Sequence, residues 1–424
     1  MKKLLLPLLI LAVTVTSGDV SAGSFRAGIA VRVVTPDPLL PVSGGVGASL
    51  SATRKEGELT VRALVFEEGT NRVAIVSADF LGFPAVLGDK VRAAIKTIPA
   101  QNILIGATHT HSAPDCYGFP DGKGGTASQP KYLESVCTRM AEAIQEAHDK
   151  LQPAQLKIAT GEARGKIAYN YYAEQLYDRR CHVIQVLDEM EKPFATLVNY
   201  AIHPEVIGNA RGICSPDLIG PLYDRIVEHG GGTGIFMNSA QGGMVTADNR
   251  QTGGGEARDW SECQRIGRLL AEEALRIVKD APAQGSPKLF CAARTLKLPV
   301  DSPLMRQLIK TIPAGVGATQ DGDAVTTQMN VVNIGNAQIL TIPGEALPNI
   351  GFYLKRKMRG EHNLLFGLTN DAFGYILTKE DYDSFKRYEY VSRTSLGERT
   401  GEILVDEALK FVNACPAPER LIVR

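Results

Sequence analysis

Three short segments carry side chains that typically bind a divalent metal ion. Histidines occupy alternate positions at His109 and His111, a third stands at His203, and a carboxylate stands at Glu345. Two histidines and one carboxylate are a common protein ligand set of catalytic zinc sites. Because side chains alternate along an extended segment, His109 and His111 would lie on one face. Either both rings face one ion, or one ring binds it while the other acts beside it.

Each of these segments follows an apolar run that is typical of a β-strand. The runs are residues 103–105, 196–198 and 339–342. In open α/β sheets, functional residues collect where strands end and loops begin. The three segments can therefore meet at one metal site. The chain has seven histidines, and four lie outside these segments; we assign those four to structural roles: His148, His182, His229 and His362.

Alternating strand and helix patterns predict an α/β fold of mixed sheets flanked by helices. Expected strands are 61–67, 72–79, 102–107, 182–187, 194–200 and 234–237, with a hairpin of 329–334 and 338–342. Expected helices are 89–96, 131–150, 217–228, 260–279 and 393–412. Ser215 is a plausible cap for the third of these helices, and Asp217 would lie in its first turn. No linker divides the chain, so we expect one large catalytic unit.

The first residues have the pattern of a secretory signal peptide. Lys2 and Lys3 precede an apolar run at 4–15, and the small residues Val20-Ser21-Ala22 form a cleavage site. We expect residues 1–22 to be removed and residues 23–424 to form the mature catalytic domain, secreted or periplasmic.

Composition excludes some classes of protein. Lys and Arg number 46, equal to Asp and Glu at 46, and no basic block indicates nucleic-acid binding. The glycine runs match neither a P-loop nor a dinucleotide fingerprint. The seven cysteines form no C-x-x-C pair, so a cysteine zinc site is not expected, and their pairing stays open.

Six motifs follow one another along the chain. They are G-A-T-H-T-H-S-A-P at 106–114, V-N-Y-A-I-H-P at 198–204, S-P-D-L-I-G at 215–220, F-M-N-S-A-Q-G at 236–242, I-P-G-E at 342–345 and F-G-Y-I-L-T-K-E-D-Y at 373–382. In this order they resemble the neutral, non-lysosomal ceramidase family, from about residue 28 to about residue 409. We expect no counterpart of that family's C-terminal immunoglobulin-like domain.

The resemblance implies a zinc-dependent enzyme of lipid metabolism that cleaves the N-acyl amide of a sphingolipid. It implies that His109, His203, Glu345 and Tyr375 hold the zinc ion, with Tyr382 as the alternative to the tyrosine. The implied partner is a lipid or small molecule with an N-acyl amide. Peripheral membrane contact is an accompanying hypothesis, and the oligomeric state stays open.

The resemblance also implies two catalytic side chains. His111 would sit beside the metal and help to activate water or stabilise the oxyanion, and Tyr388 would lie near the scissile carbonyl. Zinc-activated water needs no serine nucleophile. An imidazole such as His111 suits the proton transfer, because its unperturbed pKa of about 6.5 lies near working pH. Glu205 is a second possible base, although a solvent-exposed loop carboxylate is the simpler interpretation.

Two positions depart from the family pattern. Val245 stands where the family has a serine, with Thr246 one residue later, and Asn170 is followed by Tyr171 where the family has an arginine. We expect an exported zinc amidohydrolase with an altered substrate pocket. The alternatives are a ceramidase-like binding protein without turnover, and a zinc hydrolase of esters or peptides.

Overall fold

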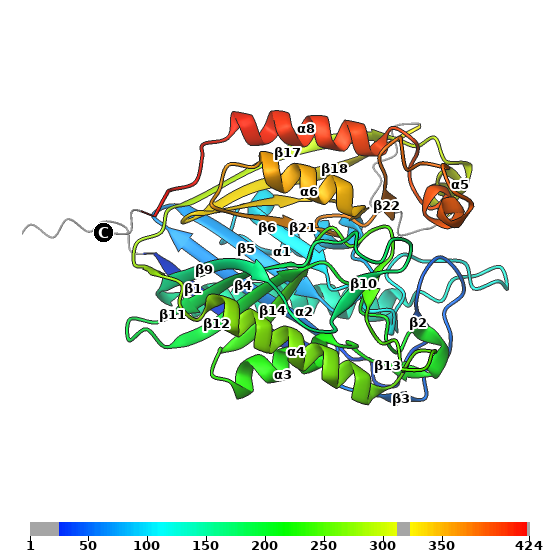
Figure 1. Ribbon diagram of the computed structural model, residues 1–424, viewed down its shortest axis with the longest axis horizontal. Helices are drawn as coiled ribbons and strands as arrows, with labels where there is room; N and C mark the ends of the chain where they lie inside the picture. Colours follow the sequence, from blue (N-terminus) through cyan, green and yellow to red (C-terminus); the bar gives the residue numbers. More distant parts are fainter. Residues whose placement is uncertain (1–24, 312–322, 422–424) are drawn as a thin grey trace, which may run out of the picture.

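The computed structural model describes residues 25–311 and 323–421. They form three large β-sheets whose inner faces share one apolar core, with helices on the outside (Figure 1). This confirms the predicted α/β class of mixed sheets flanked by helices. The predicted signal peptide, residues 1–22, lies outside the described residues.

The first sheet has the strand order β6-β5-β4-β1-β8. Its strands are β1 (Arg26–Val33), β4 (Thr60–Glu68), β5 (Asn71–Ala78), β6 (Ile103–Ala107) and β8 (Gln152–Pro153). Neighbours are antiparallel except β5 and β6, which run parallel. Both faces of β4 are apolar. Val61 and Val65 pack towards the helices, and Leu64 and Phe66 pack into the core shared by the sheets.

The other two sheets repeat this plan. The second has the order β14-β12-β11-β9-β16, and its strands are β9 (Gln155–Glu162), β11 (Arg180–Leu187), β12 (Pro193–Tyr200), β14 (Thr233–Asn238) and β16 (Ala283–Gln284). The third has the order β17-β18-β19-β21, and its strands are β17 (Leu289–Pro299), β18 (Ala324–Ile334), β19 (Ala337–Thr341) and β21 (His362–Phe366). Each again has one parallel pair, β12 with β14 and β19 with β21.

Four pairs of short strands fasten the loops at one end of the molecule, the right-hand end of Figure 1. They are β2 (Val42–Ser43) with β7 (Ala113–Pro114), β3 (Arg54–Lys55) with β13 (Ile213–Cys214), β10 (Ala168–Asn170) with β15 (Val245–Ala247), and β20 (Glu345–Ala346) with β22 (Tyr375–Ile376). These loops include the segments that carry the predicted metal ligands.

Helices cover the outer face of each sheet. The pairs are α1 (Ala85–Ala94) with α2 (Pro130–Asp149), α3 (Ile219–Glu228) with α4 (Trp260–Val278), and α6 (Pro348–Lys357) with α8 (Thr400–Ala414). The remaining helical segments are α5 (Pro303–Thr311), α7 (Glu389–Arg393) and three short 3₁₀ turns at Ala100–Asn102, Asn209–Arg211 and Lys386–Tyr388. The buried side chains of α2 recur at helical spacing, as predicted: Leu133, Val136, Met140 and Ile144.

Three of the expected helices need correction. The helix expected at 89–96 begins at Ala85, directly after Pro84, which suits a helix start. The helix expected at 393–412 is two helices, because the carbonyl of Leu396 accepts the N–H groups of Asp301 and Ser302 instead of continuing a helix. The helix expected at 217–228 begins at Ile219, since Asp217 has a φ of 54° outside the helix.

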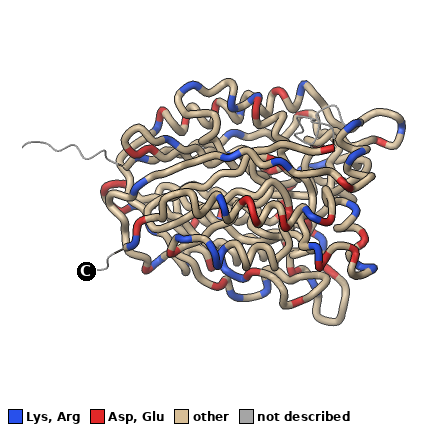
Figure 2. The backbone as a smooth tube through the Cα atoms, turned by 90° about the horizontal axis from the view of Figure 1, so that it is seen from above, with Lys and Arg blue, Asp and Glu red and all other residues tan. Residues whose placement is uncertain are grey.

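The surface of the described residues carries both signs of charge. Lys and Arg are interspersed with Asp and Glu along the backbone in Figure 2. Among the helices of residues 25–311 and 323–421, none has the length and apolarity needed to cross a bilayer.

Candidate metal centre

The parallel strand pairs of the three sheets bring their carboxyl ends together. Strand β14 lies against β6 and β21, and β12 also lies against β21. His109 follows β6, His203 follows β12, and Glu345 follows β19 after the turn Pro343-Gly344. Each of these three predicted ligands therefore comes from a different sheet.

The three side chains meet at hydrogen-bond distance. Nε2 of His203 lies 3.0 Å from Oε2 of Glu345, and Nε2 of His109 lies 3.4 Å from the same oxygen. The two rings lie 4.7 Å apart between centroids. All three side chains are buried, so the group is shielded from bulk water.

Backbone carbonyls fix both rings through their Nδ1 atoms. Nδ1 of His109 lies 2.5 Å from the carbonyl oxygen of Leu81, and Nδ1 of His203 lies 2.8 Å from that of Val245. A carbonyl oxygen only accepts, so Nδ1 carries the hydrogen in each ring. Nε2 then faces Glu345, which is the arrangement of metal-binding histidines whose second nitrogen donates to an outer partner.

His109 adopts a strained backbone conformation. Its φ is 76°, in the left-handed region, which costs a residue other than glycine on the order of 1–3 kcal/mol. The N–H of His109 donates to the carbonyl of Phe80 at 2.9 Å, and the bond from Nδ1 to Leu81 adds a second anchor. Strain held in this way is typical of functional sites.

His111 completes a cluster of three imidazoles. The possible ligand nitrogens of His109, His111 and His203 lie within 4.8 Å of one another, so this buried cluster can hold a metal ion. Nδ1 of His111 lies 3.6 Å from Oε2 of Glu205, a partly buried carboxylate, and Nε2 is buried without a hydrogen-bond partner in the described structure. Burial, with His109 and His203 adding to it, holds the pKa of His111 well below its usual value.

The charges in the group favour an ionised carboxylate. Burial alone would raise the pKa of Glu345, but the neighbouring His109 and His203 outweigh it and hold the pKa well below its usual range. Burial alone would lower the pKa of His203, yet the hydrogen bond to Glu345 leaves that pKa raised. A metal ion would need the lone pair of Nε2 on the imidazole, so its binding would depend on pH.

Tyr375 lies beside Glu345, whereas Tyr382 does not. The short strands β20 and β22 pair Glu345 directly with Tyr375, and both residues line the same cavity. The Tyr375 hydroxyl lies 3.2 Å from Sδ of Met244. Tyr382 lies in a turn in which its N–H donates to Thr378.

The two tyrosines after this segment occupy different places. Tyr388 packs on Tyr172, with ring centroids 5.1 Å apart, in a cluster that includes Tyr375. Tyr390, which the sequence analysis does not single out, lines the cavity with Glu345, and its ring lies 5.9 Å from that of Tyr375. The only signal for Tyr390 in the sequence is the repeated tyrosine of the segment Tyr388-Glu389-Tyr390.

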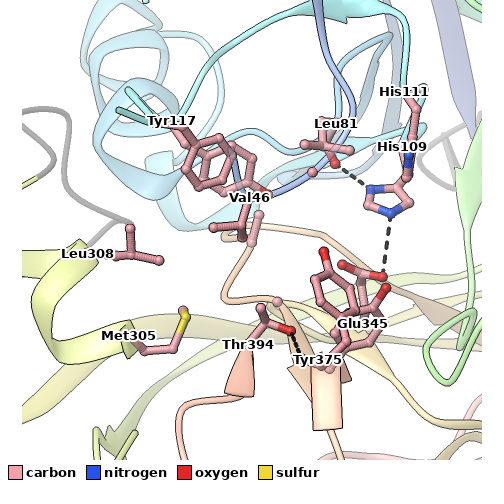
Figure 3. Close-up of a pocket in the computed structure, with 15 residues that line it drawn as sticks. Val46, Leu81, His109, His111, Tyr117, Met305, Leu308, Glu345, Tyr375 and Thr394 are labelled. Carbon is pink, nitrogen blue, oxygen red and sulfur yellow. Dashed lines mark hydrogen bonds and ion pairs between the residues drawn. The ribbon is translucent and has the colours of Figure 1, made fainter. Parts of the chain in front are cut away.

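The group lies at one end of a narrow cavity of about 60 Å³. Figure 3 shows His109, Glu345 and Tyr375 on one side and the apolar side chains Val46, Leu81, Tyr117, Met305 and Leu308 around the rest of it. The cavity therefore joins a polar reacting end to an apolar wall, the usual composition of a small-molecule site.

The two positions that depart from the family pattern lie in different surroundings. Val245 is buried, and its carbonyl accepts from both the backbone N–H and Nδ1 of His203 at 2.8 Å each. Asn170 closes a turn through the N–H groups of Tyr172 and Ala173, while the ring of Tyr171 is 63% exposed. The backbone carbonyl of Val245 thus helps to orient His203, which a carbonyl of any residue could do.

The donor set fits a transition metal such as zinc. Imidazole nitrogens and a carboxylate oxygen are ordinary zinc donors, and three such ligands leave room for water or substrate. The buried Nε2 of His111 has no partner in the described part of the chain, and buried polar atoms normally find one, so it is available to a group bound beside these donors.

The sequence is similar to those of known neutral ceramidases over part of its length. No family model matches the chain. Neutral ceramidase B of Dictyostelium discoideum is 30% identical over 187 residues, 38% of this chain, and neutral ceramidase A of the same organism is 28% identical over 134 residues, 28% of this chain. These alignments span 25% and 18% of the two relatives.

Solved structures show the same fold. The crystal structure of neutral ceramidase from Pseudomonas aeruginosa aligns with a TM-score of 0.74 and 18% identity, over 95% of this chain and 76% of that one. A ceramidase complexed with C2 aligns with a TM-score of 0.73 and 18% identity, over 95% of this chain and 77% of that one. In sequence and in fold, the chain is therefore neutral ceramidase-like.

Proposed function

We propose that this protein is a zinc-dependent amidohydrolase that cleaves an N-acyl amide. The observation that carries the proposal is the meeting of His109, His203 and Glu345, from three sheets, at the end of an apolar cavity. These residues would hold the ion, with Tyr375 beside Glu345 as the fourth ligand. A bound zinc ion polarises a carbonyl and lowers the pKa of water to about 7.

The residues of the chain supply the rest of the chemistry. His111 is partly buried and its pKa lies well below the usual value, so its Nε2 lone pair can accept a proton while Glu205 faces Nδ1. The Tyr390 hydroxyl is a candidate to donate to a developing oxyanion, since Tyr390 lines the cavity with Glu345. Tyr388 packs against Tyr172 and would support the part of the cavity wall that contains Tyr390.

Water is the nucleophile that suits this chain. Val245 offers neither a hydroxyl nor a side-chain donor where the family has a serine, and its side chain is buried in the core of the second sheet. Hydrolysis at a metal site needs no covalent intermediate. The departure at Val245 is therefore compatible with turnover.

The cavity favours a substrate with an apolar acyl group. Val46, Leu81, Tyr117 and Phe119 would surround that group while the amide carbonyl faces His109 and Glu345. The similar proteins are named ceramidases, which supports a ceramide-like lipid. Other N-acylated compounds with a short acyl group fit the same chemistry.

Export and membrane contact belong to the same proposal. The signal peptide pattern at 1–22 supports a secreted or periplasmic enzyme. Exposed aromatic side chains support peripheral contact with a lipid surface: Tyr390 lines the cavity, and Tyr171 and Phe385 are joined through the rings of Tyr172 and Tyr388.

Metal analysis and a substrate panel test the proposal together. Purified protein should contain about one zinc ion per chain and release carboxylic acid from ceramides or other N-acyl amides. Chelation should abolish release, and added Zn²⁺ should restore it. If the protein binds zinc and releases product from esters or peptides but from no N-acyl amide, it would instead be a zinc hydrolase of esters or peptides. A protein without metal and without turnover would favour the ceramidase-like binding protein.

A further inference from the structure

The side chain of Asn238 joins the two strand ends that carry His109 and His203. Asn238 is the last residue of β14, which pairs with β12 and lies against β6. Its Nδ2 donates to the carbonyl of Thr108 at 3.1 Å and to that of Ile202 at 2.7 Å. Thr108 and Ile202 are the residues immediately before the two histidines.

The amide of Asn238 uses its full hydrogen-bonding capacity. Besides the two bonds from Nδ2, Oδ1 accepts the N–H of Ile202 at 3.2 Å and that of Ser239 at 2.9 Å. All four partners are backbone groups, and the side chain is fully buried. The orientation of the amide is therefore fixed, because carbonyls only accept and N–H groups only donate.

We propose that Asn238 is a positioning residue of the metal centre, which sets the spacing between His109 and His203. The inference rests on the proposed function, since both require the two histidines to bind a metal ion. His109 and His203 leave different sheets, and Asn238 is the side chain that bonds to the backbone beside both. Partners outside the ligand shell commonly change metal affinity when they are removed.

Other side chains cannot replace this amide. In Asn238→Asp, the shape is kept, but a carboxylate oxygen replaces Nδ2 and faces two carbonyl oxygens. In Asn238→Ala, all four bonds are lost. Both changes free the backbone directly before the strained residue His109 and directly before His203.

Asn330 offers a matched control in the third sheet. It is also fully buried, and its Nδ2 donates to the carbonyls of Gln101 and Ala292 at 2.8 Å and 3.3 Å. Its Oδ1 accepts from the side chains of Gln328 and Asn370. Asn330→Ala therefore removes a comparable amide without touching Thr108 or Ile202.

The test measures metal binding rather than turnover. The dissociation constant of Zn²⁺ is measured by competition with a chromophoric chelator, the absorption spectrum of the Co²⁺-substituted protein reports ligand geometry, and urea unfolding reports stability. We expect Asn238→Ala and Asn238→Asp to bind Zn²⁺ at least roughly tenfold more weakly and to alter the cobalt spectrum. Asn330→Ala should lose stability yet keep wild-type affinity and spectrum.

The outcomes separate this inference from the proposed function. A wild-type protein that binds no Zn²⁺ overturns the function itself. If the wild type binds Zn²⁺, and folded Asn238 variants match its affinity and cobalt spectrum, the positioning role is wrong while the function stands. If Asn238→Ala does not fold, Asn238→Asp and Asn238→Ser decide the matter by the same two readouts.

Discussion

His111 differs from the other two clustered histidines in its hydrogen bonds. Nε2 of His109 and of His203 faces Glu345, whereas Nε2 of His111 has no partner among the described residues. If His111 transfers protons, His111→Ala should keep most of the bound zinc and lose roughly 100- to 10,000-fold in turnover. Metal content and kcat on the same N-acyl substrate measure the two effects.

A ligand role for His111 would give a different result. In that case the His111→Ala protein would lose zinc and turnover together, and the site would be a three-histidine centre. His148→Ala is a suitable control, because His148 lies near the end of α2 and its partner is Asp149 at the surface. It should change neither zinc content nor kcat.

Asp371 makes stability depend on pH. Its carboxyl is fully buried and accepts only the N–H groups of Ala85 and Ala372 in the described structure, so burial raises its pKa to about 8. Because folding raises this pKa, the contribution of the carboxyl to the free energy of unfolding is fully present below its pKa in the unfolded chain, about 3.9. This contribution is lost as the pH rises towards 8. Asp371→Asn should remove this loss.

Urea unfolding at several pH values measures the effect. Between pH 5 and 7, the free energy of unfolding of the wild type should fall, relative to that of Asp371→Asn, by about 1 kcal/mol per pH unit. Asp381→Asn is the control, since Asp381 lies in a partly exposed turn with Thr378. The free energy of unfolding of this variant should change with pH in parallel with that of the wild type. Parallel curves for wild type and Asp371→Asn would contradict the prediction.

At the level of elements, one lysine ties helix α6 to the second sheet. Nζ of Lys355 donates to Asp178 at 3.0 Å, and it lies 3.1 Å from both Nε2 of His182 and Oγ of Ser239. Burial alone would raise the pKa of Asp178, but Lys355 and Arg180 hold it well below its usual range. Lys355→Met leaves this carboxylate buried with one partner fewer, which should cost about 3–5 kcal/mol.

Urea unfolding also tests this prediction. Lys357→Met, on the exposed side of the same helix, should change the free energy of unfolding by less than about 0.5 kcal/mol. The double variant Lys355→Met/Asp178→Asn should recover part of the loss, because it removes the buried charge. Wild-type stability for Lys355→Met alone would show that the ion pair adds nothing.

The elements that carry the site could be predicted from the sequence because their signals are local. Apolar runs of strand length end just before His109, His203 and Glu345, and the sheets place these ends together. The prediction of one helix at 393–412 was wrong because the break depends on a distant segment. The N–H groups of residues 301–302 donate to the carbonyl of Leu396. Such a contact leaves no periodic signal.

Some residues of the candidate site could likewise be predicted from the sequence, and others could not. Histidines and a carboxylate are recognisable from their types and spacing. Tyr390 and Asn238 are not, since their roles follow from tertiary packing and from bonds to backbone groups in other segments. Asp217 shows the same limit: its carboxylate caps the N–H groups of Ile207 and Leu218 from outside the helix.

At the scale of the whole molecule, the site depends on all three sheets. Their inner faces share one core, which includes Leu64 of the first, Ile184 of the second and Leu364 of the third. His109, His203 and Glu345 come from three sheets and meet only when this core is formed. A metal ion that binds the folded chain alone would therefore stabilise the entire fold, by about 2.7 kcal/mol at 100 times its dissociation constant.

The surface beside the cavity is rich in exposed aromatic side chains. Tyr171 and Phe385 are 63% and 60% exposed, and Tyr390, which lines the cavity, is 45% exposed. Ring contacts connect Tyr171 with Phe385 through Tyr172 and Tyr388, while the ring of Tyr390 contacts that of Tyr375. The exposed cations Lys386 and Arg387 stand next to Phe385. Aromatic and basic residues together are typical of surfaces that bind a lipid interface.

If this surface meets lipid, the double variant Tyr171→Ser/Phe385→Ser should bind anionic phospholipid vesicles roughly tenfold more weakly, because two apolar side chains no longer leave water. Cosedimentation measures binding. Hydrolysis of an N-acyl lipid held in the vesicles should fall by a similar factor, while a soluble short-chain amide is cleaved at the wild-type rate. Met190→Ser, at an 83% exposed site in the turn between β11 and β12, serves as the control. Unchanged vesicle binding by the double variant would rule out this surface as the point of contact.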